Sequence, residues 1–249
     1  MIEATHQIET PDGTMETFSV HPDEGISYPA VILYMDAPGI REELRDFCRR
    51  ISGQGYYVLL PNMYYRRGTT EFEYADLMDP ATGEGTMKKM FSAMASLTNE
   101  LVMRDTRAML DFLAKQAAVK AGAKGCIGYC MSGQYVVSAA GTFPDDFAAS
   151  ASLYGVSIVT DQLDSPHLLA DRIRGELYLG FAETDEYVAD NVVPDLVAAL
   201  DANGVVHNTQ IFPATHHGFC FPQRGPLYDE ASAEKVWDEV FEMYARRLH

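Results

Sequence analysis

The sequence predicts an α/β fold, a mostly parallel central sheet of about eight strands with helices on both faces. Apolar, strand-like runs alternate with helix-like stretches along nearly the whole chain, and this alternation is typical of such sheets. Residues 29–35 form a continuous apolar run, as expected for a strand that is buried on both faces. The 249 residues suffice for a large core. Since no linker is evident, we predict a single domain over residues 1–249.

The first half of the chain is predicted to hold a hairpin, two buried strands and two helices. Pro11-Asp12-Gly13 is a turn signal between two strand-like stretches and therefore predicts the hairpin. The first helix has apolar side chains on one face and stops at Gly53-Gln54-Gly55, and the second is long and amphipathic. The predicted strands are 5–10, 15–20, 29–35 and 56–60, and the predicted helices are 41–53 and 98–119.

The second half alternates strand and helix more regularly. Its strands are apolar runs, and its helices follow them directly or after a loop. Asn203-Gly204 provides a stop signal for one of these helices. The predicted strands are 125–130, 147–154, 175–181 and 205–212, and the predicted helices are 131–141, 187–203 and 227–248.

Residues 66–98 are less regular than the rest. They contain Gly68, Pro80, Gly83 and Gly85, and several methionines follow. Two interpretations stay open for this segment. It is either a cap-like insertion over a functional site or an ordinary excursion of the surface.

The composition excludes several classes of function. The formal net charge is −17 and no run of Lys and Arg is present, so we expect no nucleic-acid partner, because phosphate binding needs basic patches. No apolar stretch approaches the roughly 18 residues that span a bilayer, and residues 1–6 lack the pattern of a signal peptide. Four cysteines do not make a disulfide scaffold. We therefore expect a cytoplasmic protein without a membrane partner.

The most informative motif is Gly128-Tyr129-Cys130-Met131-Ser132-Gly133, which joins an apolar run to a helix-like stretch. A strand that turns sharply into a helix needs small residues two positions before and after the turning residue, and Gly128 and Ser132 occupy those positions. This is the spacing of a nucleophile elbow, with Cys130 in place of the usual serine. Alone, a cysteine that ends an apolar strand is more often an inert core residue.

Two later strand ends provide the partners that a thiol nucleophile needs. Asp185 follows the run 175–181, and His216 and His217 follow the run 205–212. A base is required to form the thiolate, and an acid is required to orient the base. The order Cys, Asp, His is that of the α/β-hydrolases, and open α/β sheets place their sites at the carboxyl ends of strands.

With these motifs the chain resembles the dienelactone hydrolases, a branch of the α/β-hydrolases with a Cys-Asp-His triad. The resemblance covers nearly the whole chain and depends on Gly128-Tyr129-Cys130-Met131, Asp185-Glu186-Tyr187-Val188, His217-Gly218-Phe219 and Pro61-Asn62-Met63-Tyr64. It implies an α/β-hydrolase fold and hydrolysis of a carboxylic ester or lactone. It also implies Cys130 as nucleophile, His217 as base and Asp185 as the residue that orients the base.

The resemblance implies further residues around the nucleophile. The backbone N–H groups of Ala37 and Met131 would form the oxyanion hole, each contributing roughly 3 kcal/mol to lowering the barrier. Asp36 stands where the family usually has a Glu that contacts the resting thiol, and the alternative that Asp36 only caps a turn stays open. His216, which neighbours the implied base, would contact the substrate.

The residues that would bind an anionic substrate differ from the family pattern. Family members hold the carboxylate of dienelactone with arginines, one of them a few residues after the base. In this chain Phe221 stands at that position and Arg224 comes later. Arg66 is a candidate for the other contact. The natural substrate is therefore left open.

We expect an enzyme that forms a thioester on Cys130, acts on a small-molecule ester or lactone and needs no metal and no organic cofactor. An alternative from another class is a non-catalytic ligand-binding protein on the same fold. A third interpretation takes Cys130, His216, His217 and Cys220 as metal ligands, but their spacing is not usual for zinc. The oligomeric state is open, with a homodimer as one alternative.

Overall fold

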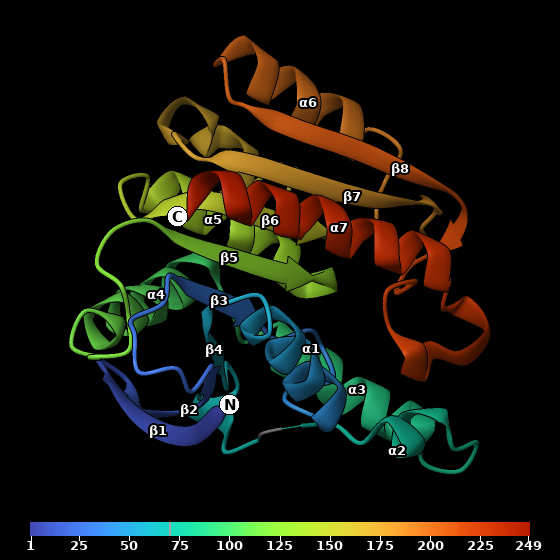
Figure 1. Ribbon diagram of the computed structural model, residues 1–249. Coiled ribbons are helices and arrows are strands. Elements are labelled where there is room, and N and C mark those ends of the chain that lie inside the picture. Colours follow the sequence, from blue (N-terminus) through green and yellow to red (C-terminus); the bar gives the residue numbers. More distant parts are fainter. Residues whose placement is uncertain (70) are drawn as a thin grey trace. The chain divides into compact units, whose positions relative to one another are not determined.

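The structure, a computed structural model, describes residues 1–69 and 71–249. The chain forms two units, Met1–Lys120 and Ala121–His249, each with its own strands and helices (Figure 1). All eight predicted strands are present among the described residues, with bounds that differ by a few residues from the prediction. In the part of the chain that the structure describes, none of the helices combines the length and the apolar character that crossing a membrane requires.

The first unit contains the predicted hairpin and a parallel pair of strands. Its elements are β1 (Ile2–Thr10), β2 (Gly13–His21), β3 (Ala30–Tyr34), α1 (Glu42–Ser52), β4 (Tyr57–Pro61), the 3-10 helix η1 (Tyr65–Arg67), α2 (Tyr74–Met78), α3 (Gly83–Met94) and α4 (Asn99–Leu113). β2 pairs antiparallel with β1 and β4, and β4 pairs parallel with β3. The predicted turn is confirmed, since Thr10 faces Gly13 across Pro11-Asp12.

The second unit is a parallel sheet with helices. Its elements are β5 (Lys124–Tyr129), the 3-10 helix η2 (Cys130–Ser132), α5 (Gly133–Thr142), β6 (Phe147–Leu153), η3 (Pro166–Arg172), β7 (Glu176–Thr184), α6 (Val192–Ala202), β8 (His207–His216), η4 (Pro222–Leu227) and α7 (Glu230–Arg247). The strands β5, β6, β7 and β8 pair in parallel in chain order. Their carboxyl ends therefore lie along one edge of this sheet.

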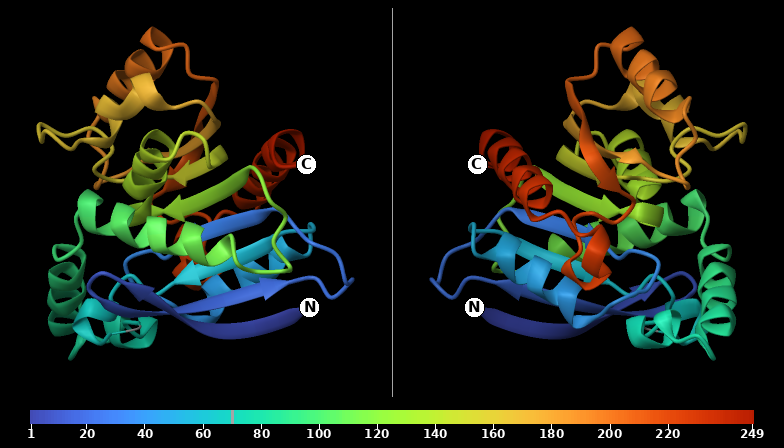
Figure 2. Two further views of the ribbon diagram at one scale, coloured as in Figure 1. Left: turned by 90° about the vertical axis from the view of Figure 1, so that its left-hand side faces the viewer. Right: turned by 90° about the vertical axis from the view of Figure 1, so that its right-hand side faces the viewer.

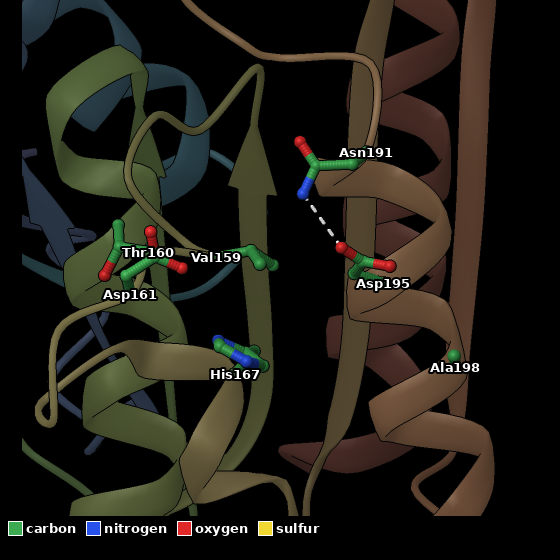
Figure 3. A pocket seen from close by; sticks show the side chains of 7 residues that line it. All are labelled: Val159, Thr160, Asp161, His167, Asn191, Asp195 and Ala198. Carbon is green, nitrogen blue, oxygen red and sulfur yellow. Dashed lines mark hydrogen bonds between the residues drawn. The ribbon is translucent and has the colours of Figure 1, made fainter.

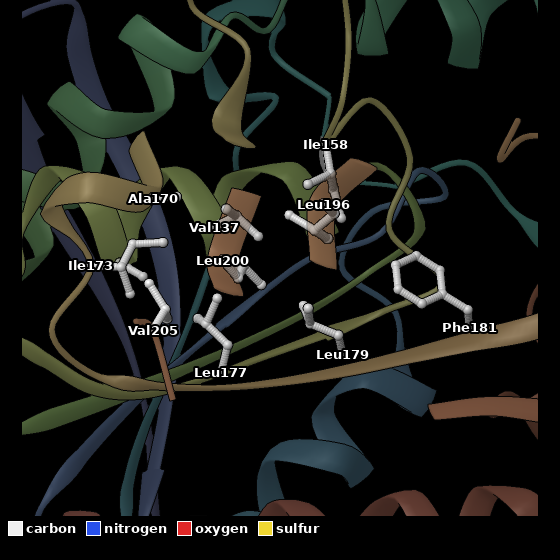
Figure 4. Close-up of a cluster of buried hydrophobic side chains, with 11 residues drawn as sticks. Val137, Ile158, Ala170, Ile173, Leu177, Leu179, Phe181, Leu196, Leu200 and Val205 are labelled. Carbon is white, nitrogen blue, oxygen red and sulfur yellow. The ribbon is translucent and has the colours of Figure 1, made fainter. Parts of the chain in front are cut away.

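One face of β7 carries the core that α5 and α6 cover. Leu177, Leu179 and Phe181 alternate along the strand and point to this face, as the period of a strand requires (Figure 4). Leu196 and Leu200 of α6 are fully buried against them. Each such side chain contributes roughly 1.5–3 kcal/mol by leaving water. This packing fixes β7 and, with it, the residue that follows the strand.

The opposite face of the same sheet is covered by α7. In both views of Figure 2 the red helix α7 and the yellow-green helix α5 lie on opposite sides of these strands. The hydroxyl of Tyr244 donates to the carbonyl oxygen of Cys126 at 3.0 Å. The side chain of Gln210 donates to Glu239 at 2.9 Å. Helices thus cover both faces of this sheet, as predicted.

Three predicted helices were too long. The helix expected over 98–119 ends at Leu113, because the chain beyond it pairs with Tyr28. The amide of Tyr28 donates to the carbonyl oxygen of Ala118 at 2.9 Å, and the amide of Lys120 donates to that of Tyr28 at 2.7 Å. The helix expected from 187 begins only at Val192. The closing helix likewise begins at Glu230 rather than at 227, after Asp229 caps it.

The segment 66–98 is more regular than predicted. It includes α2 and α3, and α3 begins at Gly83 even though glycine is a poor helix former. A Cβ at Gly83 would lie 2.7 Å from the carbonyl oxygen of Leu77, so the packing of α3 on α2 explains this glycine. Residue 70 lies outside the described residues. The cap-like role of the segment and the single domain over 1–249 stay predictions.

Candidate active site

Three of the predicted site residues directly follow strands of one parallel sheet. Cys130 follows β5, Asp185 follows β7 and His217 follows β8. They therefore lie along the same edge of the second unit, the edge at which α/β sheets place their sites. His216, predicted to lie beyond the strand, is instead the last residue of β8, because the pairing of β7 with β8 extends to Thr184 and His216.

Cys130 has the backbone conformation of a sharp, strained turn. Its φ is 55°, a value in the left-handed region that residues other than glycine rarely adopt. The carbonyl oxygen of Cys130 accepts a hydrogen bond of 3.1 Å from the amide of Val156, which holds the turn against the loop after β6. Cys130 is partly exposed, whereas Cys48, Cys126 and Cys220 are buried.

Close packing around this turn requires small residues, as predicted. A Cβ on Gly128 would lie 2.8 Å from the carbonyl oxygen of Ser132 and 2.9 Å from its Cβ. The backbone approaches its neighbours still more closely at Gly133, the residue after Ser132, where a Cβ would lie 2.2 Å from the Cα of Gly155. Real Cβ atoms do not come so near to backbone atoms. The residues two positions from Cys130 thus allow β5 to turn into α5.

The carboxylate of Asp185 is bonded through both of its oxygens. Oδ2 lies 2.8 Å from Nδ1 of His217, and Oδ1 accepts the amide N–H of Tyr187 at 2.9 Å. The second bond explains why residues 187–191 form a turn rather than the start of a helix. With Nδ1 turned to the carboxylate, the other ring nitrogen of His217 is left for the reaction.

The electrostatics of His217 favour the protonated ring. Burial has the largest influence and lowers the pKa of His217, but the hydrogen bond with Asp185 and the interactions with Cys130 together outweigh it and raise the pKa to about 9. The sulfur of Cys130 is thus near enough to act on the ring. Nε2 of His217 is buried and has no hydrogen-bond partner among the described residues.

A cavity of about 300 Å³ opens beside this histidine. It is lined by Thr184, Glu186, Tyr187, His216, His217, Arg224 and Leu227. His216 is exposed and lines the cavity, which suits the substrate contact predicted for it, although the contact itself stays a prediction. Arg224 lines the same cavity and packs against Gly218.

The sequence did not single out the two aromatic side chains that contact His217. The ring of Tyr154 lies 5.0 Å from the imidazole and that of Tyr187 lies 4.8 Å away, both in T-shaped geometry. The φ of Tyr154, 36°, could not be read from the sequence. Tyr187 had a usable signal, because it follows Asp185 by two residues and a backbone amide at that spacing can bind the carboxylate.

Asp36, in the first unit, has a partner that the sequence did not predict. Its buried carboxylate accepts two hydrogen bonds from Arg41, of 2.6 and 3.1 Å. Arg41 also donates to Glu43 at 2.8 Å and to the carbonyl oxygen of Gly39 at 3.3 Å. The loop after β3 is therefore held by a buried ion cluster. A contact between Asp36 and Cys130 stays a prediction.

The two predicted oxyanion donors are backbone groups of buried residues. The carbonyl oxygen of Ala37 accepts a hydrogen bond of 2.9 Å from the hydroxyl of Tyr64, and that of Met131 accepts one of 3.0 Å from the side chain of Gln134. These bonds restrain the peptide groups next to the proposed donors. The oxyanion hole itself stays a prediction.

Arg66, predicted to contact an anionic substrate, is engaged within the first unit. Its guanidinium binds both oxygens of Asp105 at 2.8 Å and Oδ2 of Asp12 at 2.7 Å. It also lies over the ring of Tyr65, 4.4 Å from the ring centre. These contacts tie the hairpin turn to α4, so a substrate would have to compete with two carboxylates for this cation. The substrate contact of Arg66 stays a prediction.

Other parts of the structure differ from this site in the groups that they bring together. Among the described residues, no group of three or more His, Cys, Asp or Glu side chains is arranged to hold a metal ion. A second cavity, of about 460 Å³, lies between the loop after β6 and the start of α6, where His167 and Asp161 face Asn191 and Asp195 (Figure 3). It contains none of the predicted site residues.

Comparison with known proteins supplies the family context. A sequence model of the Dienelactone hydrolase family matches residues 15–248. A Synechocystis sp. protein named "Putative carboxymethylenebutenolidase" is 26% identical, over 89% of this chain and 87% of its own. "Protein usf" of Aquifex pyrophilus is 27% identical, over 84% of each chain. The solved structure of a "Putative Dienelactone Hydrolase" from Klebsiella pneumoniae matches with a TM-score of 0.84 at 22% identity, over 98% of each chain. This last likeness confirms the predicted α/β-hydrolase fold.

Proposed function

Because the chain belongs to the dienelactone hydrolase family and is a hydrolase of carboxylic esters or lactones, we propose that Cys130 is its nucleophile and that a thioester is its intermediate. The observation that supports this most directly is the hydrogen bond between Asp185 and His217, whose raised pKa also reflects the partly exposed Cys130. Since the chain is a hydrolase, the alternative of a non-catalytic binding protein is not retained.

The proposed first half-reaction acylates the sulfur. With a pKa of about 9, His217 is mostly protonated near neutral pH, and the thiolate is the form in which a cysteine acts as a nucleophile. The thiolate of Cys130 attacks the carbonyl carbon, and the carbonyl electrons move to the oxygen, where the N–H groups of Ala37 and Met131 stabilise the charge. The tetrahedral intermediate collapses to a thioester, and the leaving alkoxide takes the proton of His217.

The second half-reaction releases the acid. His217, now neutral, accepts a proton from a water molecule as that water attacks the thioester carbonyl. Collapse expels the thiolate of Cys130 and leaves a carboxylic acid, which ionises. In a lactone the alcohol and the acid remain on one molecule, so the product is a hydroxy acid. Asp185 keeps Nδ1 engaged throughout and stabilises the imidazolium.

We expect the variant Cys130→Ala to lose at least roughly a thousandfold in kcat/KM, because removing the nucleophile of a triad leaves only binding and oxyanion stabilisation. The measurement is turnover of a panel of short-chain 4-nitrophenyl esters and five- and six-membered lactones. Iodoacetamide should abolish the same activity and add one label per chain, since the other cysteines are buried.

The matched control is Cys48→Ala, which removes a buried thiol from α1 in the first unit. It should hydrolyse the panel at the rate of the unmodified protein and remain sensitive to iodoacetamide. Retention of full ester activity by Cys130→Ala would rule out the cysteine mechanism. The cytoplasmic location and a homodimer remain proposals from the sequence, to be tested by fractionation of cells and by light scattering.

A further inference from the structure

Tyr187 contacts both members of the Asp185–His217 pair. Its amide N–H donates to Oδ1 of Asp185 at 2.9 Å, while Oδ2 of the same carboxylate binds Nδ1 of His217 at 2.8 Å. The carboxylate is therefore held at both ends, and rotation about its Cβ–Cγ bond would break one contact or the other. The backbone of Tyr187 thus orients the group that orients the imidazole.

The ring of Tyr187 also borders the imidazole, on its exposed side. The two ring centres are 4.8 Å apart, with an angle of 66° between the planes. Tyr187 is 52% exposed, whereas His217 is only 7% exposed. The other aromatic neighbour of His217, Tyr154, is fully buried. Of the two rings, that of Tyr187 is therefore the one that faces the solvent.

The hydroxyl end of Tyr187 lies among the charges of the site. Burial raises the pKa of this hydroxyl, and so do Glu186, through a hydrogen bond and its charge, and Cys130, whereas Arg224 lowers it. The same side chain lines the 300 Å³ cavity together with His216 and His217. Tyr187 thus borders both the imidazole and the cavity.

We propose that Tyr187 is a positioning residue for His217, whose amide fixes the Asp185 carboxylate and whose ring keeps water from the Asp185–His217 hydrogen bond. The assignment of His217 as the base rests on the function proposed above, but the contacts do not. A hydrogen bond between charged groups is stronger where water is excluded. Without the ring, water would weaken every electrostatic influence on His217. This includes both the burial that lowers the pKa of His217 and the partners that raise it.

The test compares Tyr187→Ala, which removes the ring, with Tyr187→Phe, which keeps it. In the unmodified protein, burial and the charged partners together raise the pKa of His217 to about 9. Water admitted by Tyr187→Ala should therefore lower this pKa toward its ordinary value of 6.5. The turnover number kcat should fall roughly tenfold, with a smaller change in KM, because misplacement of a catalytic group impairs the chemical step. Tyr187→Phe should match the unmodified protein within about twofold in kcat, and the pKa of His217 in this variant should be that of the unmodified protein.

The measurements are the chemical shift of the His217 ring protons against pH and steady-state hydrolysis of one 4-nitrophenyl ester. Leu168→Ala is the matched control, because Leu168 is an equally exposed apolar residue of the same unit, at 54%, away from the cavity. It should change neither quantity. Tyr187→Leu, judged by the same criteria, replaces Tyr187→Ala if the latter shows no cooperative thermal unfolding.

Two results would overturn the proposal. The first is a Tyr187→Ala protein with unchanged kcat and unchanged His217 pKa. The second is a Tyr187→Phe protein as impaired as Tyr187→Ala, which would assign the effect to the hydroxyl rather than to the ring. Because the titration of His217 needs no substrate, it decides the positioning role even if the unmodified protein hydrolyses no ester, an outcome that would count against the proposed function alone.

Discussion

At the scale of single residues, the charge on His217 depends on a balance between burial and two partners. Burial alone would keep the ring neutral, since it lowers the pKa of His217, yet Asp185 and Cys130 raise it to about 9. The partners prevail because Asp185 is bonded through Oδ2 at 2.8 Å and held through Oδ1 by a backbone amide. A group in such a state is expected at functional sites.

We expect Asp185→Asn to lower the pKa of His217 well below 9, because the variant loses the partner charge while burial persists. A pKa raised by folding stabilises the protein fully below the ordinary value of 6.5, and this stabilisation is lost as the pH rises through about 9. The stability advantage of the unmodified protein over Asp185→Asn should therefore decrease between pH 6.5 and 9. Titration of the ring protons and urea unfolding at several pH values measure both effects, and an advantage that grows over this range would contradict the assignment.

At the scale of elements, the reactive turn depends on how closely β5 and α5 approach their neighbours. The left-handed conformation of Cys130 costs free energy of the order of 1–3 kcal/mol, and the surrounding packing has to offset it. Gly133 begins α5 against the backbone of Gly155. The loop after β6 and the first turn of α5 therefore act as one packed unit around the cysteine.

We expect Gly133→Ala to destabilise the protein by roughly 1–3 kcal/mol or more, because its Cβ would lie 2.2 Å from the Cα of Gly155 and the backbone would have to shift. The matched control is Gly85→Ala in α3, where no heavy atom lies within 4 Å of the added Cβ. That variant should be stabilised by roughly 0.5–1 kcal/mol, as alanine favours a helix over glycine. Free energies of unfolding in urea measure both, and equal effects of the two substitutions would contradict the close approach.

At the scale of the whole molecule, the net charge of −17 acts on any charged ligand before it reaches the site. A protein of this charge repels anions over distances of the Debye length, about 30 Å at 0.01 M salt and about 8 Å at 0.15 M. The rate of encounter with an anionic substrate should therefore depend on ionic strength.

We expect kcat/KM for an anionic ester, the 4-nitrophenyl monoester of succinic acid, to rise severalfold between about 0.01 and 0.15 M salt as the repulsion is screened. The neutral control is 4-nitrophenyl butyrate, an ester of nearly the same size, whose kcat/KM should stay constant. The comparison needs only initial rates with the unmodified protein. A fall in kcat/KM for the anion would instead show that cations near the site prevail over the net charge.

Much of the fold and part of the site could be predicted because those features depend on short stretches of sequence. The buried strands are continuous apolar runs, the hairpin has its own turn signal, and Gly128 and Ser132 flank Cys130 at the spacing of a sharp turn. The order of Cys130, Asp185 and His217 at strand ends was enough to predict one shared edge. Each of these inferences needs only neighbouring residues and the rule that parallel strands end together.

The tertiary structure decided the features that depend on which distant groups meet. Arg41 donates hydrogen bonds to the carboxylate of Asp36, and Arg66 donates to that of Asp105. The helix after residue 98 ends early because the backbone that follows it forms hydrogen bonds with Tyr28. Tyr187 borders His217 although thirty residues separate the two in sequence, a spacing that is usual between neighbouring parallel strands. Hydrogen-bonding capacity and charge are properties of the sequence, but the choice of partner depends on distances that only the packed chain defines.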